Sequence, residues 1–127
     1  MGWFSKNKEE KKQSGLPWIM LKSVDQLKKA IEESAEKPVL LFKHSTRCSI
    51  SSMAMNSFQR GWTGTPEEMD LYYLDLLSYR DISNAMAEET GIVHQSPQVI
   101  VVKNKEVVYT ATHSSINARS ALNSIKK

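Results

Sequence analysis

Apolar and polar positions along this chain follow two periods in turn, one typical of strands and one typical of helices. Short apolar runs between polar segments predict five strands, at 16–21, 39–42, 69–76, 98–103 and 107–112. Apolar residues spaced by three and four predict helices at 24–35, 49–61 and 79–90, and a last helix that begins after Ser114 or Ser115. The predicted order is therefore β-α-β-α-β-α-β-β-α.

Polar residues mark where several of these helices begin and end. Ser23 is the expected N-cap of the first helix, with Gln26 as its capping-box partner. Asp81 or Ser83 is expected to cap the third helix, and Gly91 to end it. The second helix is expected to end at Gly61 and to pack through four apolar residues: Ile50, Met53, Ala54 and Phe58.

The order of elements predicts an α/β fold. Strands that alternate with helices are joined by right-handed crossovers and pair in parallel. The last two strands flank a tight turn at 104–106 and predict an antiparallel hairpin. The continuously apolar run 39–42 is typical of a strand buried on both faces. We therefore expect a three-layer sandwich, with a mixed central sheet and helices on both faces.

Composition and charge narrow the classes of function. The 127 residues carry a net charge of +3, which the two ends supply, since residues 1–15 have four lysines against two glutamates and the chain finishes with two lysines. Nucleic-acid binding needs a concentrated basic face, and the sequence shows none. No apolar run reaches the length of a membrane span. We expect a charged leader at 1–15, one domain at 16–127, a monomer and a cytoplasmic location.

The single cysteine, Cys48, lies where the buried strand 39–42 gives way to the second helix. Ligands and chemistry in α/β sheets gather beyond the carboxyl ends of the strands. A helix N-terminus offers free N–H groups and partial positive charge, both of which favour a thiolate over a thiol. Arg47, and also Lys43 or His44, would add positive charge. The sequence therefore predicts a nucleophilic thiol at Cys48.

A second feature is the dipeptide Ser96-Pro97, just before the strand at 98–103. The order of elements is expected to bring this loop to the same end of the sheet as the Cys48 turn. We predict a cis peptide bond here, which would leave the backbone of Ser96 free to pair with an extended thiol substrate; the alternative is a trans proline that starts the strand.

The pattern of elements, with a cysteine opening the second helix and a proline before a later strand, resembles the thioredoxin fold. The segment "FKHSTRCSIS", at 42–51, more specifically resembles the signature of the YtxJ-type general stress proteins, the monothiol bacilliredoxins. The segment "SPQVIVVKNKEVVYTATH" and the helix after it are also similar, so the resemblance covers about 17–125.

This resemblance implies a thiol–disulfide exchange protein that removes bacillithiol from S-thiolated cysteines of other proteins. It implies Cys48 as the reactive cysteine, Pro97 as the cis proline beside Ser96, and an active-site turn completed by Thr46, Arg47, Ser49, Ile50 and Ser51. Bacillithiol would be a co-substrate, and no bound cofactor or metal is expected. The implied partners are S-bacillithiolated proteins, and free bacillithiol or a reductase that regenerates Cys48.

The absence of a second cysteine limits the chemistry. Ser51 stands three residues after Cys48, where a dithiol oxidoreductase would carry its resolving cysteine. The chain cannot form an internal disulfide, so one thiol exchange is what remains. Ser51 is expected either to hydrogen-bond the thiolate or to be an ordinary serine of the first helical turn.

Two other functions compete with this interpretation. The chain could be a non-catalytic thioredoxin-like binding module in which Cys48 is inert. It could also carry an iron–sulfur cluster, as monothiol glutaredoxins with Cys-Gly-Phe-Ser do, although the segment here reads Cys-Ser-Ile-Ser. The first alternative predicts an unreactive thiol, and the second predicts a coloured dimer after anaerobic purification.

Overall fold

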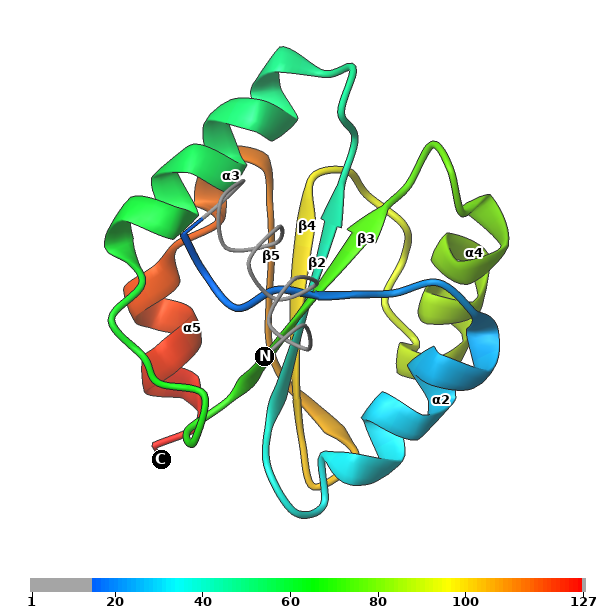
Figure 1. Ribbon diagram of the computed structural model, residues 1–127, viewed down its shortest axis with the longest axis vertical. Helices are drawn as coiled ribbons and strands as arrows, with labels where there is room; N and C mark the ends of the chain where they lie inside the picture. The colour runs from blue at the N-terminus through cyan, green and yellow to red at the C-terminus, as the bar shows by residue number, and fades with distance from the viewer. Residues whose placement is uncertain (1–14, 127) are drawn as a thin grey trace, which may run out of the picture.

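The computed structural model describes residues 15–126, in which helices cover both faces of a five-stranded sheet (Figure 1). The elements are β1 (Ile19–Met20), α2 (Val24–Glu33), β2 (Val39–His44), α3 (Ser49–Gly61), β3 (Asp70–Asp75), α4 (Arg80–Thr90), β4 (Gln98–Lys103), β5 (Glu106–Thr112), the 3₁₀ turn η1 (His113–Ser115) and α5 (Ala118–Ser124). The expected leader at 1–15 lies outside the described residues, apart from Gly15.

The sheet has the strand order β1-β3-β2-β4-β5, with β2 in the centre. β3 pairs in parallel with both β1 and β2, whereas β4 is antiparallel to β2 and to β5. This mixed sheet confirms the predicted α/β class. Because β2 and β3 run in the same direction, the turn into α3 and the loop into α4 leave the sheet at one end, the upper end in Figure 1.

Side chains alternate between two cores along the central strand, as the pleat requires. Leu40 and Phe42 pack beneath α3 and α5 with Phe58 and Trp18, while Leu41 packs on the other face beneath α2 and α4. Burying such a large apolar side chain stabilises a fold by roughly 1.5–3 kcal/mol. The three layers therefore arise because both faces of β2 are apolar, as the run at 39–42 predicts.

The first helix begins as predicted, with a small difference in its cap. Ser23 Oγ accepts a hydrogen bond from the Gln26 amide at 3.1 Å. Gln26 Oε1 accepts from the Lys22 amide at 2.7 Å, one residue before the position that a regular capping box uses. The helix ends at Glu33, two residues earlier than predicted, which leaves Ala35 exposed.

The packing face predicted for α3 is partly wrong. Ala54 and Phe58 are buried, but the exposed fractions of Ile50 and Met53 are 54% and 69%. Successive residues of an α-helix are about 100° apart around its axis, so Ile50, eight positions before Phe58, is displaced from it by about 80°. The side that faces the core is completed instead by Ser51 and Met55.

Two predicted caps are also wrong. α4 begins after Tyr79 without a side-chain cap, so neither Asp81 nor Ser83 caps it, although Gly91, at φ 75°, ends it as expected. Ser114 and Ser115 form η1 instead of capping the last helix. The cap of α5 is Asn117, whose Oδ1 accepts from the Ser120 amide at 2.8 Å, because the chain makes one more turn before that helix starts.

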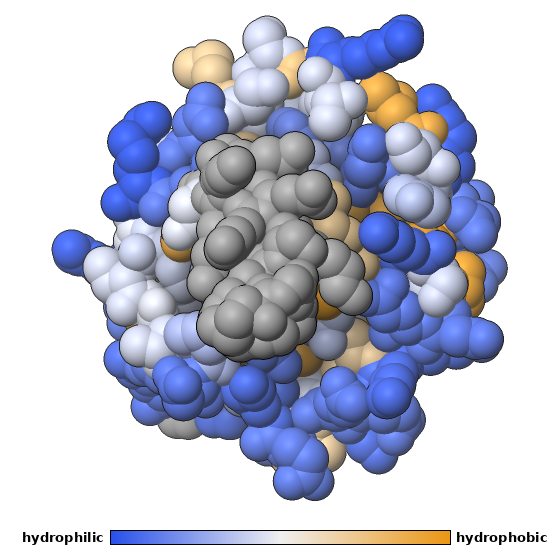
Figure 2. Space-filling view, viewed as in Figure 1, coloured by the Kyte–Doolittle hydropathy of each residue, from blue (hydrophilic) through white to orange (hydrophobic). Residues whose placement is uncertain are grey.

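Four of the five strands differ in length from their predictions: β3 is one residue shorter at each end, β5 begins one residue earlier, and the other two differ more. β1 shrinks from 16–21 to two residues, and β2 continues beyond 42 through the buried polar residues Lys43 and His44. Within residues 15–126 no helix is long and apolar enough to cross a bilayer. On the face shown in Figure 2, hydrophilic residues predominate and hydrophobic ones form small separate patches.

Candidate active site

Cys48 is the N-cap residue of α3, at the end of the sheet where β2 and β3 both finish. Its side chain is half-buried and makes no capping hydrogen bond, so its sulfur is not engaged by the helix. The Cys48 amide donates to Ser45 O at 3.1 Å, and Cys48 O accepts from the Ser52 amide at 3.0 Å. These two bonds fix the turn that places Cys48 beside the free N–H groups of the first helical turn.

The turn that carries Cys48 is tied to α3 by the hydroxyl of Ser51, which is fully buried. Ser51 Oγ accepts from the Ser45 amide at 3.0 Å and lies 2.6 Å from His44 Nδ1. Burial lowers the pKa of His44, opposed by the nearby Asp75 carboxylate, so the imidazole is neutral near pH 7 and its Nδ1 shares a hydrogen bond with the Ser51 hydroxyl. Ser51, a serine of the first turn of α3, therefore also holds the Cys48 turn through Ser45 and His44, contacts that the sequence did not predict.

The Ser96-Pro97 dipeptide lies beside the end of β2, as predicted. The register pairs Lys43 with Gln98, which places Pro97 next to His44, four residues before Cys48. The Ser96–Pro97 peptide bond is cis, as predicted. Ser96 Oγ is buried and has no hydrogen-bond partner among the described residues.

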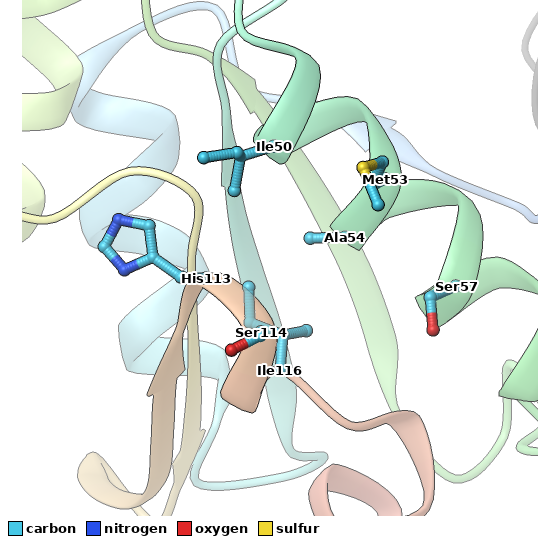
Figure 3. A pocket seen from close by; sticks show the side chains of 7 residues that line it. All are labelled: Ile50, Met53, Ala54, Ser57, His113, Ser114 and Ile116. Atoms are coloured by element: carbon cyan, nitrogen blue, oxygen red, sulfur yellow. The ribbon is translucent and has the colours of Figure 1, made fainter.

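An apolar groove flanks the Cys48 turn on the side of β4 and β5. It lies between the first turns of α3 and the segment after β5, as Figure 3 shows, and its lining residues are Ile50, Met53, Ala54, Ser57, His113, Ser114 and Ile116. The His113 amide donates to Pro97 O at 3.1 Å, which joins this segment to the proline loop. Of the predicted site residues, Ile50 belongs to this groove.

A second, polar pocket flanks the turn on the side of β3. Thr46 and Arg47 contribute from the Cys48 turn, Asp75, Leu77 and Ser78 from the loop after β3, and Arg80 from the start of α4. Sequence reasoning missed the contribution of this loop. The signal was present, because the loop follows the carboxyl end of the strand that pairs with β2.

A buried lysine lies under the same end of the sheet, on the face that α2 and α4 cover. Lys43 is 1% exposed, and its Nζ lies 2.9 Å from His94 Nδ1. Burial lowers the pKa of Lys43 to about 8. Burial and the charges of Lys43 and Arg80 lower the pKa of His94, so a neutral His94 accepts the hydrogen bond from the lysine. Its amine is therefore held by His94 on this face of the sheet, and its charge reaches the Cys48 turn only through space.

The structure brings the predicted site residues to one end of the sheet, on consecutive positions of the turn or beside β2. Ser49 begins α3, and its N–H is one of the free amides at the helix start. Within residues 15–126, no three His, Cys, Asp or Glu side chains are grouped to hold a metal ion.

Comparison with known proteins identifies a family. The family model described as monothiol bacilliredoxin BrxC matches residues 19–121. A solved structure described provisionally as an oxidoreductase with a thioredoxin fold is 37% identical, with a TM-score of 0.71 and coverage of 87% of this chain and 94% of that chain.

More distant structures share the fold alone. Thioredoxin f from spinach chloroplast, in its short form, is 15% identical with a TM-score of 0.65, covering 87% of this chain and 94% of that chain. The thioredoxin of Malassezia sympodialis is 20% identical with a TM-score of 0.61, covering 84% and 86% respectively. These comparisons confirm the predicted thioredoxin-like fold.

Proposed function

The chain belongs to the monothiol bacilliredoxin family, and from that premise we propose that it removes bacillithiol from S-thiolated cysteines of other proteins through Cys48. Its family and its fold support a thiol–disulfide redox function. The observation that supports the removal of bacillithiol is the placement of the single cysteine. Cys48 is half-buried at the N-terminus of α3, and its side chain makes no capping hydrogen bond.

The reaction consists of two thiol exchanges. In the first, the Cys48 thiolate attacks the bacillithiol sulfur of the client's mixed disulfide. A new Cys48–bacillithiol disulfide forms, the client's disulfide breaks, and the client leaves as a thiolate that takes a proton from water. In the second, another thiolate attacks the same bacillithiol sulfur, which releases Cys48 and leaves the new disulfide in solution.

The second exchange needs a thiol from outside the chain, because Ser51 replaces a resolving cysteine. Free bacillithiol can supply it, as can a reductase partner. We expect a monomer in the reducing cytoplasm, where Cys48 returns to the thiol form between turnovers and no resident cofactor is needed.

The apolar groove beside Cys48 supports a polypeptide client. Ile50 and Met53 are large apolar side chains that remain exposed within five residues of the reactive sulfur. Exposed apolar surface of this kind is typical of contact with another protein chain. The polypeptide half of the mixed disulfide is therefore expected to lie over α3 and η1.

The test is intact-mass measurement after the reduced protein is mixed with bacillithiol disulfide and, separately, with glutathione disulfide. We expect one rapid bacillithiol adduct per chain, slow reaction with glutathione, and no adduct in Cys48→Ser. An S-bacillithiolated protein should then lose its modification when free bacillithiol regenerates Cys48. Absence of an adduct at neutral pH, or equally slow reaction with both disulfides, would contradict the proposal and favour the binding module.

A further inference from the structure

The polar pocket on the β3 side of the Cys48 turn carries two arginines that face one hollow from different elements. Arg47 precedes Cys48 directly, and Arg80 is the first residue of α4. Within residues 15–126, neither guanidinium takes part in an ion pair or a side-chain hydrogen bond. Two permanently charged side chains thus share a hollow beside the reactive cysteine, and neither has an ion-pair partner among the described residues.

The one carboxylate that lines this pocket is committed to its own loop. Asp75 Oδ1 accepts from the Leu77 amide at 3.2 Å, and Oδ2 accepts from Ser78 Oγ at 2.9 Å. These bonds shape the loop that presents Arg80. Two guanidinium charges against one carboxylate leave the lining positive, and the Thr46 hydroxyl is an additional donor at its edge.

Charge outside the lining adds to the positive potential. The charges of Lys43 and Arg80 both contribute to a lower pKa for His94, which places all three groups near one another. Asp81 follows Arg80 and is exposed on α4. Guanidinium groups bind carboxylates with paired N–H donors, so two of them suit a ligand with more than one carboxylate.

We propose that Arg47 and Arg80 bind the carboxylates of the small thiol that Cys48 takes from its client, which in bacillithiol are those of its malate group. This proposal rests on the exchange reaction described above. The pocket and the apolar groove lie on opposite sides of the Cys48 turn, toward β3 and toward β5. A mixed disulfide can then lie across the turn with its anionic small half in the pocket and its polypeptide half in the groove.

This orientation decides which sulfur is attacked. With its carboxylates held beside Arg47, the small thiol presents its own sulfur to Cys48, and the client sulfur is the leaving group. The products are the disulfide between Cys48 and the small thiol, and the client thiolate. The opposite attack would join Cys48 to the client and release the small thiol unused.

The experiment compares two small symmetric disulfides, with adduct formation on Cys48 followed by intact mass. One probe is the disulfide of mercaptosuccinate, which carries two carboxylates on each half. The other is bis(2-hydroxyethyl) disulfide, which is neutral. We expect Arg47→Gln and Arg80→Gln each to slow the dicarboxylate probe by roughly two- to fivefold, as the loss of an exposed ion pair would. The neutral probe should keep its rate.

The neutral probe separates recognition from activation of the thiol. Slowing of both probes by the same factor would mean that the arginines act on Cys48 itself, and would overturn the pocket. Arg60→Gln, an exposed arginine in the last turn of α3, is the matched control and should change neither rate. Because salt screens exposed charges, the effect of Arg47→Gln should also shrink between low and high ionic strength.

A further arm tests whether the arginines bind the client instead. Peptide mixed disulfides that carry 2-mercaptoethanol, with the cysteine flanked by glutamate or by glutamine, would be compared. A dependence on Arg47 and Arg80 seen for the glutamate peptide and not for mercaptosuccinate disulfide would overturn the proposal. If Cys48 reacts with neither small probe, the exchange reaction is refuted together with the pocket. If Cys48 reacts with the mercaptosuccinate disulfide at the same rate in the wild type and in both arginine variants, only the pocket is refuted.

Discussion

The position of one side chain, Ser51, shows how a residue that replaces a resolving cysteine keeps a structural function. Its hydroxyl oxygen accepts a hydrogen bond from the Ser45 amide and shares a second hydrogen bond with His44 Nδ1, and both partners lie at the carboxyl end of β2. The serine therefore connects the first turn of α3 to the central strand directly beneath the Cys48 turn. Loss of the hydroxyl would leave a buried imidazole nitrogen and a backbone amide without partners.

We predict that Ser51→Ala lowers the free energy of unfolding by about 1–3 kcal/mol, the usual effect of leaving buried polar groups unpaired. It should also slow adduct formation on Cys48, because the turn is less firmly held. Urea denaturation and intact-mass kinetics measure the two effects. Ser57→Ala, an exposed serine on the same helix, should have nearly the stability of the wild type. Equal stability of both variants would contradict the role given to Ser51.

At the scale of an element, α3 shows two different surfaces. One side packs Ala54, Met55 and Phe58 into the core, and the neighbouring side leaves Ile50 and Met53 exposed along the apolar groove (Figure 3). The helix thus positions the reactive cysteine at its start and offers a contact surface along its first two turns. Its stability comes from the first side, and its expected contact with clients comes from the second.

We predict that Met53→Glu slows removal of bacillithiol from a protein client by several-fold, because a charge in the groove opposes apolar contact. The rate of adduct formation with a small disulfide should be unchanged, since that substrate has no polypeptide half. Quantitative mass spectrometry of the client measures the first rate. Val108→Glu, which changes an exposed valine on β5, is the control and should alter neither rate. Equal slowing of both substrates by Met53→Glu would argue against client contact.

At the scale of the whole molecule, the buried Lys43 links the active end of the sheet to overall stability. Burial lowers the pKa of this lysine to about 8, against 10.5 for a free side chain. Between these two values the unfolded chain binds more protons than the folded chain, so stability rises with pH. Below pH 8 the lysine is charged in both states, and the fold retains the cost of burying that charge.

We therefore predict that the free energy of unfolding increases by about 1–2 kcal/mol between pH 7.5 and about pH 9.5. The range stops there because burial raises the pKa of Tyr72 to about 12 and also that of Tyr73, which opposes the trend at higher pH. Chemical denaturation across this range measures the slope. Lys43→Met should flatten it and stabilise the protein at pH 7, whereas Lys28→Met, on the exposed side of α2, should preserve it. A slope unchanged in Lys43→Met would contradict the prediction.

The sequence by itself determined the order of the elements, the covered mixed sheet and the location of Cys48 at the start of α3. These features depend on local periodicity and on short signals such as Ser23 and Gly91, which act within a few residues. The sequence also predicted that Pro97 lies beside the end of β2, because the order of strands and helices along the chain permits few arrangements of the sheet.

Tertiary structure alone decided which side of α3 faces the core and which residues Ser51 and Lys43 hydrogen-bond. It alone also decided that Arg80 lines the same pocket as Arg47. Ile50 and Met53 are apolar and match a helical spacing, so the local pattern did not distinguish them from core residues. Their exposure depends on the rotation of α3 against β2, which Phe58 and Met55 set from further along the helix. The arginine pocket depends on two segments about thirty positions apart in the sequence, and only the parallel pairing of β2 and β3 brings them together.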